Sequence, residues 1–109
     1  CINTGGEKVF PEEVEEALKL HDSVNDAVVV GVPDDKFGQA ITAIVEATAG
    51  ETIDEAALIE HVKGKLAHYK SPKRALAVDT IGRAPNGKVD YKRHTTYAID
   101  ELGLNADVN

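Results

Sequence analysis

The 109-residue chain is predicted to have an α+β fold, in which a small, mainly antiparallel sheet of about three strands carries helices in a two- to three-layer sandwich. Three observations support this prediction. Runs of β-branched residues indicate strands near residues 24–32 and 41–47, and a third short strand is expected at 75–78. Apolar residues at helical spacing indicate helices near 11–21 and 54–67. The connection between the first two strands is short, which suits antiparallel neighbours.

The chain opens with a glycine pair, Gly5-Gly6, inside an expected two-stranded ribbon over residues 2–9. Glycine tolerates φ > 0, so the pair suits either a tight turn or a close approach of the backbone to a ligand. Pro11 is well suited to the first position of the helix that follows. Glu13 and Glu15 lie two residues apart and do not share a helix face, so we interpret them as helix-surface or hinge-side structure and not as a catalytic pair.

Two strands and a helix are expected in the middle of the chain. The first strand is the valine-rich run 24–32, and the second follows Gly38, with Ile44 interrupting an otherwise clean alternation. Asp54 is a good N-cap for a helix that should run to about Ala67. The helix-end residue His21 and the surface residues His61 and His68 lack further ligands at suitable spacing, and we expect no metal site.

The C-terminal part of the chain is basic and contains two loops. Pro72 biases the preceding residue away from helix, so a basic loop is expected before the short strand at 75–78. A second loop follows the strand, and a final helix is expected from Tyr91 to about Leu102, ended by Gly103.

Charge is distributed unevenly along the chain, whose formal net charge is −7. Residues 1–35 hold nine acidic and two basic residues, whereas residues 63–93 hold nine basic and two acidic residues, giving −7 and +7 respectively. The basic segment suits a phosphorylated ligand or the protein's own acidic half, and a solvated surface without a partner is the alternative. Nucleic acid is disfavoured as a partner, because aromatic residues are sparse and the overall balance is acidic.

The amino-acid composition indicates the cellular compartment in which the protein is expected. Cys1 is the one cysteine, so no internal disulfide forms and a reducing cytoplasm is expected. No apolar run approaches the roughly 20 residues of a membrane span, and no signal-peptide pattern opens the chain. The sequence contains no methionine, so we expect the chain to be a piece of a longer protein.

The turn sequence Pro85-Asn86-Gly87 can hold the next residue, Lys88, at its tip. A lysine ammonium is a point charge on a flexible stem, which makes it a better clamp for anions than a proton abstractor. A solvated surface lysine remains the alternative when these residues are considered alone.

Four motifs in a fixed order connect this turn with the rest of the chain. They are Gly5-Gly6-Glu7-Lys8-Val9-Phe10-Pro11-Glu12-Glu13-Val14-Glu15, Val30-Gly31-Val32-Pro33-Asp34 with Gly38-Gln39, Tyr69-Lys70-x-Pro72-x-Arg74, and Pro85-x-Gly87-Lys88. From Ile2 to about Arg93 the sequence closely resembles the C-terminal domain of the adenylate-forming enzymes, which include acyl-CoA synthetases, peptide-synthetase adenylation domains and luciferases. The first motif is most similar to acyl-CoA synthetases of the fatty-acid type.

The resemblance implies that residues 1–103 form a mobile lid domain, that 104–109 are a frayed tail, and that the N-terminal catalytic domain is absent from this chain. It implies an AMP-forming ligase that uses ATP, with Mg²⁺ in the parent enzyme, and coenzyme A as co-substrates, without a tightly bound cofactor in this domain. Lys88 matches the catalytic lysine that assists acyl adenylate formation. Partners would be the missing domain, a carboxylic acid, ATP and CoA.

After the first half-reaction, as the resemblance implies, the lid rotates and presents another face. The loop Gly5, Gly6 and Glu7 then borders the tunnel for the pantetheine arm. Basic residues that could meet a CoA phosphate are Lys8, Lys70, Lys73 and Arg74. The isolated chain is expected to be inactive.

Two alternatives stay open from the sequence. The chain could be the lid of an amino-acid adenylation domain that serves a carrier protein. It could also be a stand-alone module that uses its basic segment to bind an anion or an acidic protein.

Overall fold

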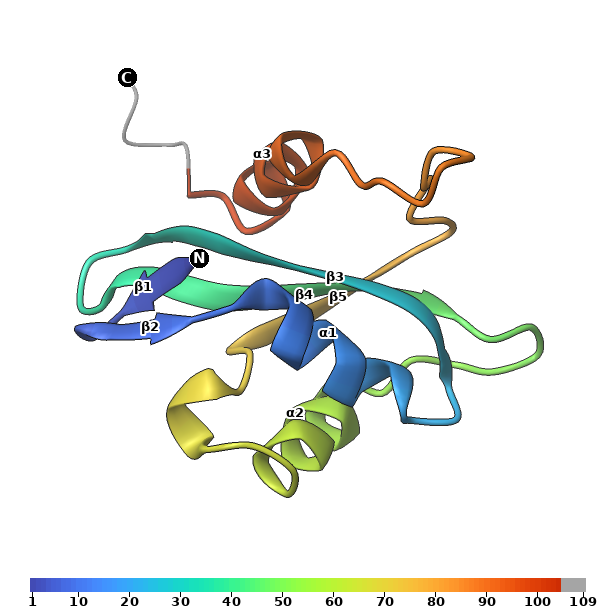
Figure 1. Ribbon diagram of the computed structural model, residues 1–109, viewed down its shortest axis with the longest axis horizontal. Coiled ribbons are helices and arrows are strands. Elements are labelled where there is room, and N and C mark those ends of the chain that lie inside the picture. The colour runs from blue at the N-terminus through green and yellow to red at the C-terminus, as the bar shows by residue number, and fades with distance from the viewer. Residues whose placement is uncertain (105–109) are drawn as a thin grey trace.

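The computed structural model describes residues 1–104 and shows a three-layer α+β domain (Figure 1). A three-stranded sheet forms the middle layer, with α1 and α2 on one face and α3 on the other. The elements in chain order are β1 Ile2–Thr4, β2 Glu7–Val9, α1 Pro11–Lys19, β3 Val24–Asp34, β4 Gly38–Ala47, α2 Glu55–Lys63, the short 3-10 helix η1 His68–Lys70, β5 Arg74–Val78 and α3 Tyr91–Glu101. The predicted fold class is confirmed.

The central sheet has the strand order β3-β4-β5. β3 and β4 form the predicted antiparallel pair, whereas β5 runs parallel to β4 because the chain crosses over through α2 before it returns. β1 and β2 form a separate antiparallel hairpin, which is the expected ribbon. Two of the three pairings are therefore antiparallel.

Strand β4 lies at the centre of the sheet and is covered on both faces, which explains the interrupted alternation at Ile44. Ala43 and Val45 belong to the core cluster beneath α1 and α2, while Ile44 belongs to the cluster beneath α3. All three side chains are fully buried. A strand covered by helices on both faces needs apolar residues at successive positions, and not only at alternate ones.

Local signals set most helix boundaries. The Asp54 carboxylate accepts a hydrogen bond from the Ala57 amide, as expected of an N-cap. The prediction that this helix reaches about Ala67 was wrong, because α2 ends at Lys63 and Gly64 follows. Glycine is a poor helix former, and the Lys65 amide turns back to the Val62 carbonyl in a tighter final turn.

Helix α3 ends as predicted at Gly103, whose φ of +70° suits glycine. The Gly103 amide donates to the Asp100 carbonyl and the Leu104 amide to the Ile99 carbonyl, the hydrogen-bond pair of a Schellman motif. Leu104, which the sequence places in the tail, packs against the cluster beneath α3. The rest of the expected tail, 105–109, lies outside the described residues.

Two features are absent from the described part of the chain. Within residues 1–104, no helix has the length and apolarity needed to cross a membrane. The same residues contain no group of three or more His, Cys, Asp or Glu side chains placed to hold a metal ion.

Candidate functional site

Lys88 lies at the exposed tip of the loop between β5 and α3. The Ala84 amide donates to the Lys88 carbonyl at 2.9 Å, and the Gly87 amide donates to the Ala84 carbonyl at 2.8 Å. The Asn86 side chain accepts from the Lys88 amide at 3.1 Å, and Gly87 adopts a φ of +85°. The predicted turn chemistry is therefore present, and it presents Lys88 on a closed backbone turn.

Arg83 ties this loop to β3. Its Nε donates to Asp26 Oδ2 at 2.7 Å and its Nη2 to Asp26 Oδ1 at 2.9 Å, while Nη1 donates to the Gly87 carbonyl at 3.1 Å. Burial alone raises the pKa of Asp26, but hydrogen bonds from Arg83 and the Ala27 amide outweigh it and hold this pKa below its ordinary value. The hydrogen bond to Asp26 raises the pKa of Arg83. Sequence reasoning did not single out Arg83 or Asp26.

Tyr91, the first residue of α3, fixes the other end of the loop. Its hydroxyl donates to the Glu15 carboxylate at 2.9 Å, and the same carboxylate accepts from the Val29 amide at 2.9 Å. Burial, followed by the hydrogen bond to Glu15, raises the pKa of Tyr91. The interpretation of Glu15 as a helix-surface residue was wrong, since only 5% of it is exposed. Its carboxylate satisfies polar groups of β3 and α3.

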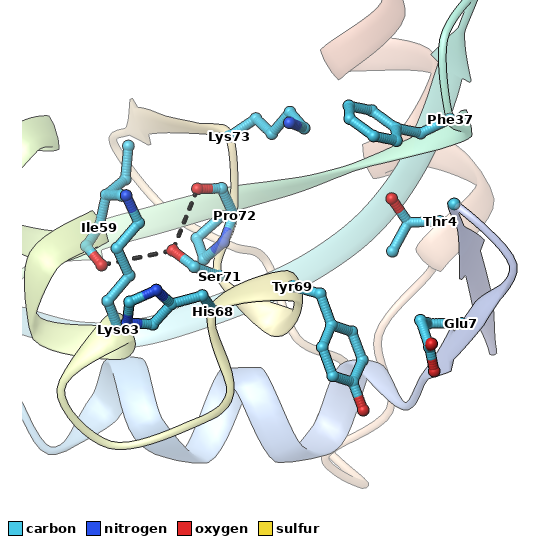
Figure 2. A pocket seen from close by; sticks show the side chains of 11 residues that line it. Thr4, Glu7, Phe37, Ile59, Lys63, His68, Tyr69, Ser71, Pro72 and Lys73 are labelled. Atoms are coloured by element: carbon cyan, nitrogen blue, oxygen red, sulfur yellow. Dashed lines mark hydrogen bonds between the residues drawn. The ribbon is translucent and has the colours of Figure 1, made fainter.

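A second feature, here called the hairpin groove, lies beside the β1–β2 hairpin (Figure 2). It is an open pocket of about 780 Å³ between the hairpin, the β3–β4 turn, α2 and the η1 segment. Its lining residues are Thr4, Gly5, Glu7, Phe37, Ile59, Lys63, His68, Tyr69, Ser71, Pro72 and Lys73. Within it, the Ser71 hydroxyl contacts the Ile59 and Pro72 carbonyl oxygens, each at 3.3 Å.

Gly5 and Gly6 form the two-residue turn of the hairpin, between the paired residues Thr4 and Glu7. Their φ angles are +59° and +86°, as a type I′ turn requires at both central positions. A side chain on Gly6 would extend into open space, whereas a Cβ on Gly5 would lie 3.2 Å from the Phe37 ring. The two glycines therefore form a tight turn, which is one of the two uses expected of them.

Phe37 anchors the hairpin turn to the sheet. Its carbonyl accepts from the Gly5 amide at 2.9 Å, and Lys73 Nζ lies 4.2 Å from the centroid of its ring. Phe37 and Tyr69 were missed as groove residues in the sequence, although each lies within or beside a motif. The available signal was an aromatic residue next to Gly38-Gln39 and another at the start of the basic loop.

Two of the basic residues predicted to bind CoA form ion pairs with carboxylates of this chain. Lys70 Nζ lies 2.8 Å from Glu13, which raises the pKa of Lys70, and Arg74 Nε lies 2.7 Å from Glu55. With Arg83–Asp26, two ion pairs connect the basic segment with the acidic N-terminal segment, as one interpretation of the charge pattern expects.

The structure separates the predicted site residues into two groups. Gly5, Glu7 and Lys73 meet at the hairpin groove, while Gly6, Lys8, Lys70 and Arg74 lie outside its lining. Among the described residues, none from the loop between β5 and α3 lines the groove. Figure 1 shows the hairpin at one end of the domain and the β5–α3 loop, in orange, toward the other end.

His61 is not the surface residue that the sequence predicts. It is partly buried, its Nε2 donates to the Ala17 carbonyl at 2.7 Å, and its ring meets the His21 ring edge-on with centroids 5.1 Å apart. This contact joins α2 to α1. His68 is exposed, as expected.

Comparison with known proteins gives consistent matches. The family model for the AMP-binding enzyme C-terminal domain matches residues 13–88. The medium/long-chain-fatty-acid–CoA/3-oxocholest-4-en-26-oate–CoA ligase of Mycolicibacterium smegmatis is 52% identical over 91 residues, which are 84% of this chain and 16% of that protein. Triostin synthetase I of Streptomyces triostinicus is 46% identical over 99 residues, covering 90% of this chain and 19% of that protein.

A solved structure gives the same result. The fatty acyl CoA synthetase of Mycobacterium tuberculosis superposes with a TM-score of 0.78 at 34% identity, over 86% of this chain and 18% of that one. The chain therefore spans less than a fifth of the length of these three relatives.

Proposed function

The chain belongs to the family of AMP-binding enzyme C-terminal domains, and from that premise we propose that it is the lid of an AMP-forming acyl-CoA ligase acting on fatty acids. Its likeness to a medium/long-chain fatty-acid–CoA ligase supports this substrate class. The observation that carries the proposal is that the β1–β2 hairpin and the β5–α3 loop, which contains Lys88, lie toward opposite ends of one domain. The parent enzyme would act in the cytoplasm.

In the first half-reaction, a carboxylate oxygen of the substrate attacks the α-phosphorus of ATP. The bond to pyrophosphate breaks, and acyl adenylate and pyrophosphate form. Two anions must approach each other, so a preorganised cation lowers the barrier. Lys88 is the group for this role, because its turn holds an exposed ammonium on a fixed backbone. Mg²⁺ would neutralise charge on ATP, held by parts of the enzyme outside this chain.

In the second half-reaction, the thiolate of CoA attacks the acyl carbon, and the bond to AMP breaks. The hairpin groove would border the path of the pantetheine arm. Gly5 and Glu7 line it, and Gly6 lies beside them in the same hairpin turn. Lys73 lines the groove and is the first candidate for a CoA phosphate. Lys8 is exposed and follows the groove residue Glu7 in the sequence. Lys70 and Arg74 would first have to leave their carboxylate partners.

In this scheme, each of the two features serves one half-reaction. Their separation supports a rotation of the domain between the half-reactions, with the domain moving as a unit. The rest of such an enzyme would hold ATP and the acyl chain, in keeping with the 16% of the Mycolicibacterium smegmatis ligase which this chain spans. We expect the isolated chain to be inactive.

The test is Lys88→Ala in the full-length enzyme. Adenylation, followed by pyrophosphate release, should slow by roughly 10²-fold or more, the scale of losing one preorganised electrostatic group. Thioester formation from supplied acyl adenylate and CoA should be largely spared. Lys92→Ala removes another exposed ammonium four residues away and should leave both half-reactions unchanged. Equal losses in both half-reactions of Lys88→Ala would contradict the proposal.

A second candidate is the lid of an amino-acid adenylation domain, because one relative, triostin synthetase I, is not named as a CoA ligase. The acceptor distinguishes the two. Transfer of the activated acyl group to CoA supports the ligase, and transfer only to a phosphopantetheinyl carrier protein supports the second candidate. A stand-alone binding module would instead bind ATP, CoA or an acidic protein as the isolated chain.

A further inference from the structure

The backbone on both sides of Lys88 is held by hydrogen bonds. In the peptide group before it, the amide of Lys88 donates to the Asn86 side chain and the carbonyl of Gly87 accepts from Arg83. In the peptide group after it, the Lys88 carbonyl accepts from the Ala84 amide at 2.9 Å. Each of these partners except Arg83 belongs to the turn itself.

Of the three groups that form these hydrogen bonds, Arg83 is the one that also contacts the sheet. Its guanidinium grips both oxygens of Asp26, at 2.7 and 2.9 Å, and contacts the Ala27 carbonyl at 3.3 Å. Asp26 and Ala27 belong to β3, the strand that pairs with the central strand β4. A bidentate arginine–carboxylate contact fixes orientation as well as distance, because both groups are planar.

The contact is shielded from solvent, unlike most ion pairs at protein surfaces. The exposed fractions of the Arg83 and Asp26 side chains are 28% and 17%, compared with 51% and 38% for Arg74 and Glu55. An ion pair of this kind keeps its geometry better than one between two exposed side chains. The loop thus has a rigid link to the sheet at the residue directly before Lys88.

We propose that Arg83 is a positioning residue for adenylation, which transmits the position of β3 to Lys88 through the Gly87 carbonyl. This inference rests on the function proposed for Lys88. Asp26 is the second half of the device, because it holds the guanidinium in the orientation that reaches Gly87. Without it, the turn remains closed by its own hydrogen bonds but loses its fixed position relative to the sheet.

Misplacement of a catalytic group by about 1 Å can cost on the order of 10²-fold in rate. Arg83→Gln should accordingly slow adenylation by roughly 10- to 100-fold, with the loss in kcat and little change in KM for ATP, since Arg83 does not contact ATP in this scheme. Thioester formation from supplied acyl adenylate should be nearly unchanged. Asp26→Asn should give the same pattern in weaker form.

The decisive experiment is a double-mutant cycle in the full-length enzyme with Arg83→Gln and Lys88→Ala. If Arg83 acts through Lys88, its replacement has no further effect on adenylation once Lys88 is absent. Independent, additive losses would overturn the inference. If Lys88→Ala alone leaves adenylation fast, the proposed function fails instead. If adenylation is slow in Lys88→Ala but remains fast in Arg83→Gln, only the positioning role fails.

Arg93→Gln is the matched control. Arg93 Nη2 donates to the Ile81 carbonyl at 2.9 Å, so Arg93, like Arg83, forms a hydrogen bond with a backbone carbonyl of this loop. That carbonyl lies at the start of the loop and not at Gly87. Its replacement should leave adenylation within about threefold of the unmodified enzyme. A second control, Val62→Ala, weakens the core beneath α2 and should lower stability without a selective loss of adenylation. An equal adenylation defect in either control would overturn the assignment to Arg83.

Discussion

At the scale of single residues, His94 shows how burial sets a charge state. It is 6% exposed on α3, and its Nε2 lies 2.9 Å from the Ile81 carbonyl. A carbonyl only accepts hydrogen bonds, so Nε2 carries the proton. Burial lowers the pKa of His94 below its ordinary value of 6.5, although the hydrogen bond to Ile81 acts in the opposite direction. The neutral ring therefore helps to hold the start of the Lys88 loop against α3.

This arrangement predicts a pH dependence of stability. Unfolded His94 takes up a proton below its ordinary pKa of 6.5, whereas the folded residue resists it. The unfolded state then binds more protons, so the free energy of unfolding is highest above this pH and falls as the pH is lowered through it. Urea unfolding at pH 7.5 and 5.5 measures the difference.

His94→Gln is the control for this prediction, since it retains a donor for the Ile81 carbonyl without titrating. It should reduce the pH dependence between 7.5 and 5.5. The lowered pKa values of Asp26, Glu46 and Glu55 act below about pH 4.5, outside this window. An unchanged pH dependence in His94→Gln would assign it to other groups.

At the scale of elements, Glu15 links three of them. It lies on α1, accepts from the backbone of β3 through Val29, and accepts from the Tyr91 hydroxyl at the start of α3. The two helices lie on opposite faces of the sheet, so this contact at its edge connects the two layers. The buried carboxylate depends on these donors in place of water.

Tyr91→Phe removes the hydroxyl and leaves Glu15 with the Val29 amide alone from this set. We expect a loss of roughly 1–3 kcal/mol in the free energy of unfolding, the range for a buried polar group that loses a partner. Tyr97→Phe is the matched control on the same helix, because no hydrogen bond of the Tyr97 hydroxyl occurs among the described residues. Equal losses in both variants, measured by urea unfolding, would contradict a specific role for the Glu15 contact.

In the whole molecule, the β5–α3 loop with Lys88 and the β1–β2 hairpin beside the groove lie toward opposite ends. A substitution at one end should therefore affect one half-reaction. Gly6 is the position to change at the hairpin, because a side chain there extends into open space and not into the domain core.

Gly6→Leu should lower stability by roughly 1–2 kcal/mol, because a leucine is strained at a φ of +86° whatever the available space. Gly50→Leu is matched to it in φ, +83°, and in open surroundings, but lies in the β4–α2 loop. Both variants should be destabilised similarly. In the full-length enzyme, only Gly6→Leu should accumulate acyl adenylate while pyrophosphate release stays fast. Normal CoA turnover in Gly6→Leu would rule out the hairpin as a wall of the pantetheine path.

Features that depend on neighbouring residues could be predicted from the amino-acid sequence alone. Pro11 begins α1, Asp54 caps α2 and Gly103 ends α3, because each acts on hydrogen bonds within one turn of its own position. The turns at Gly5-Gly6 and Gly87 follow equally from the φ angles that glycine tolerates. These local signals, together with the order of the motifs, were sufficient for the fold class, the family and the candidate lysine.

Contacts between residues that lie far apart in the chain could not be predicted from the sequence. Arg83 and Asp26 are 57 positions apart, and Tyr91 and Glu15 are 76 apart, so no local pattern marks either pair. The same holds for the burial of Glu15 and the convergence of Phe37, Tyr69 and the hairpin on one groove. A charged residue has many possible partners in the sequence. The packing of helices on both faces of the sheet selects one, because a partly buried charge is stable only where the fold brings a partner to it.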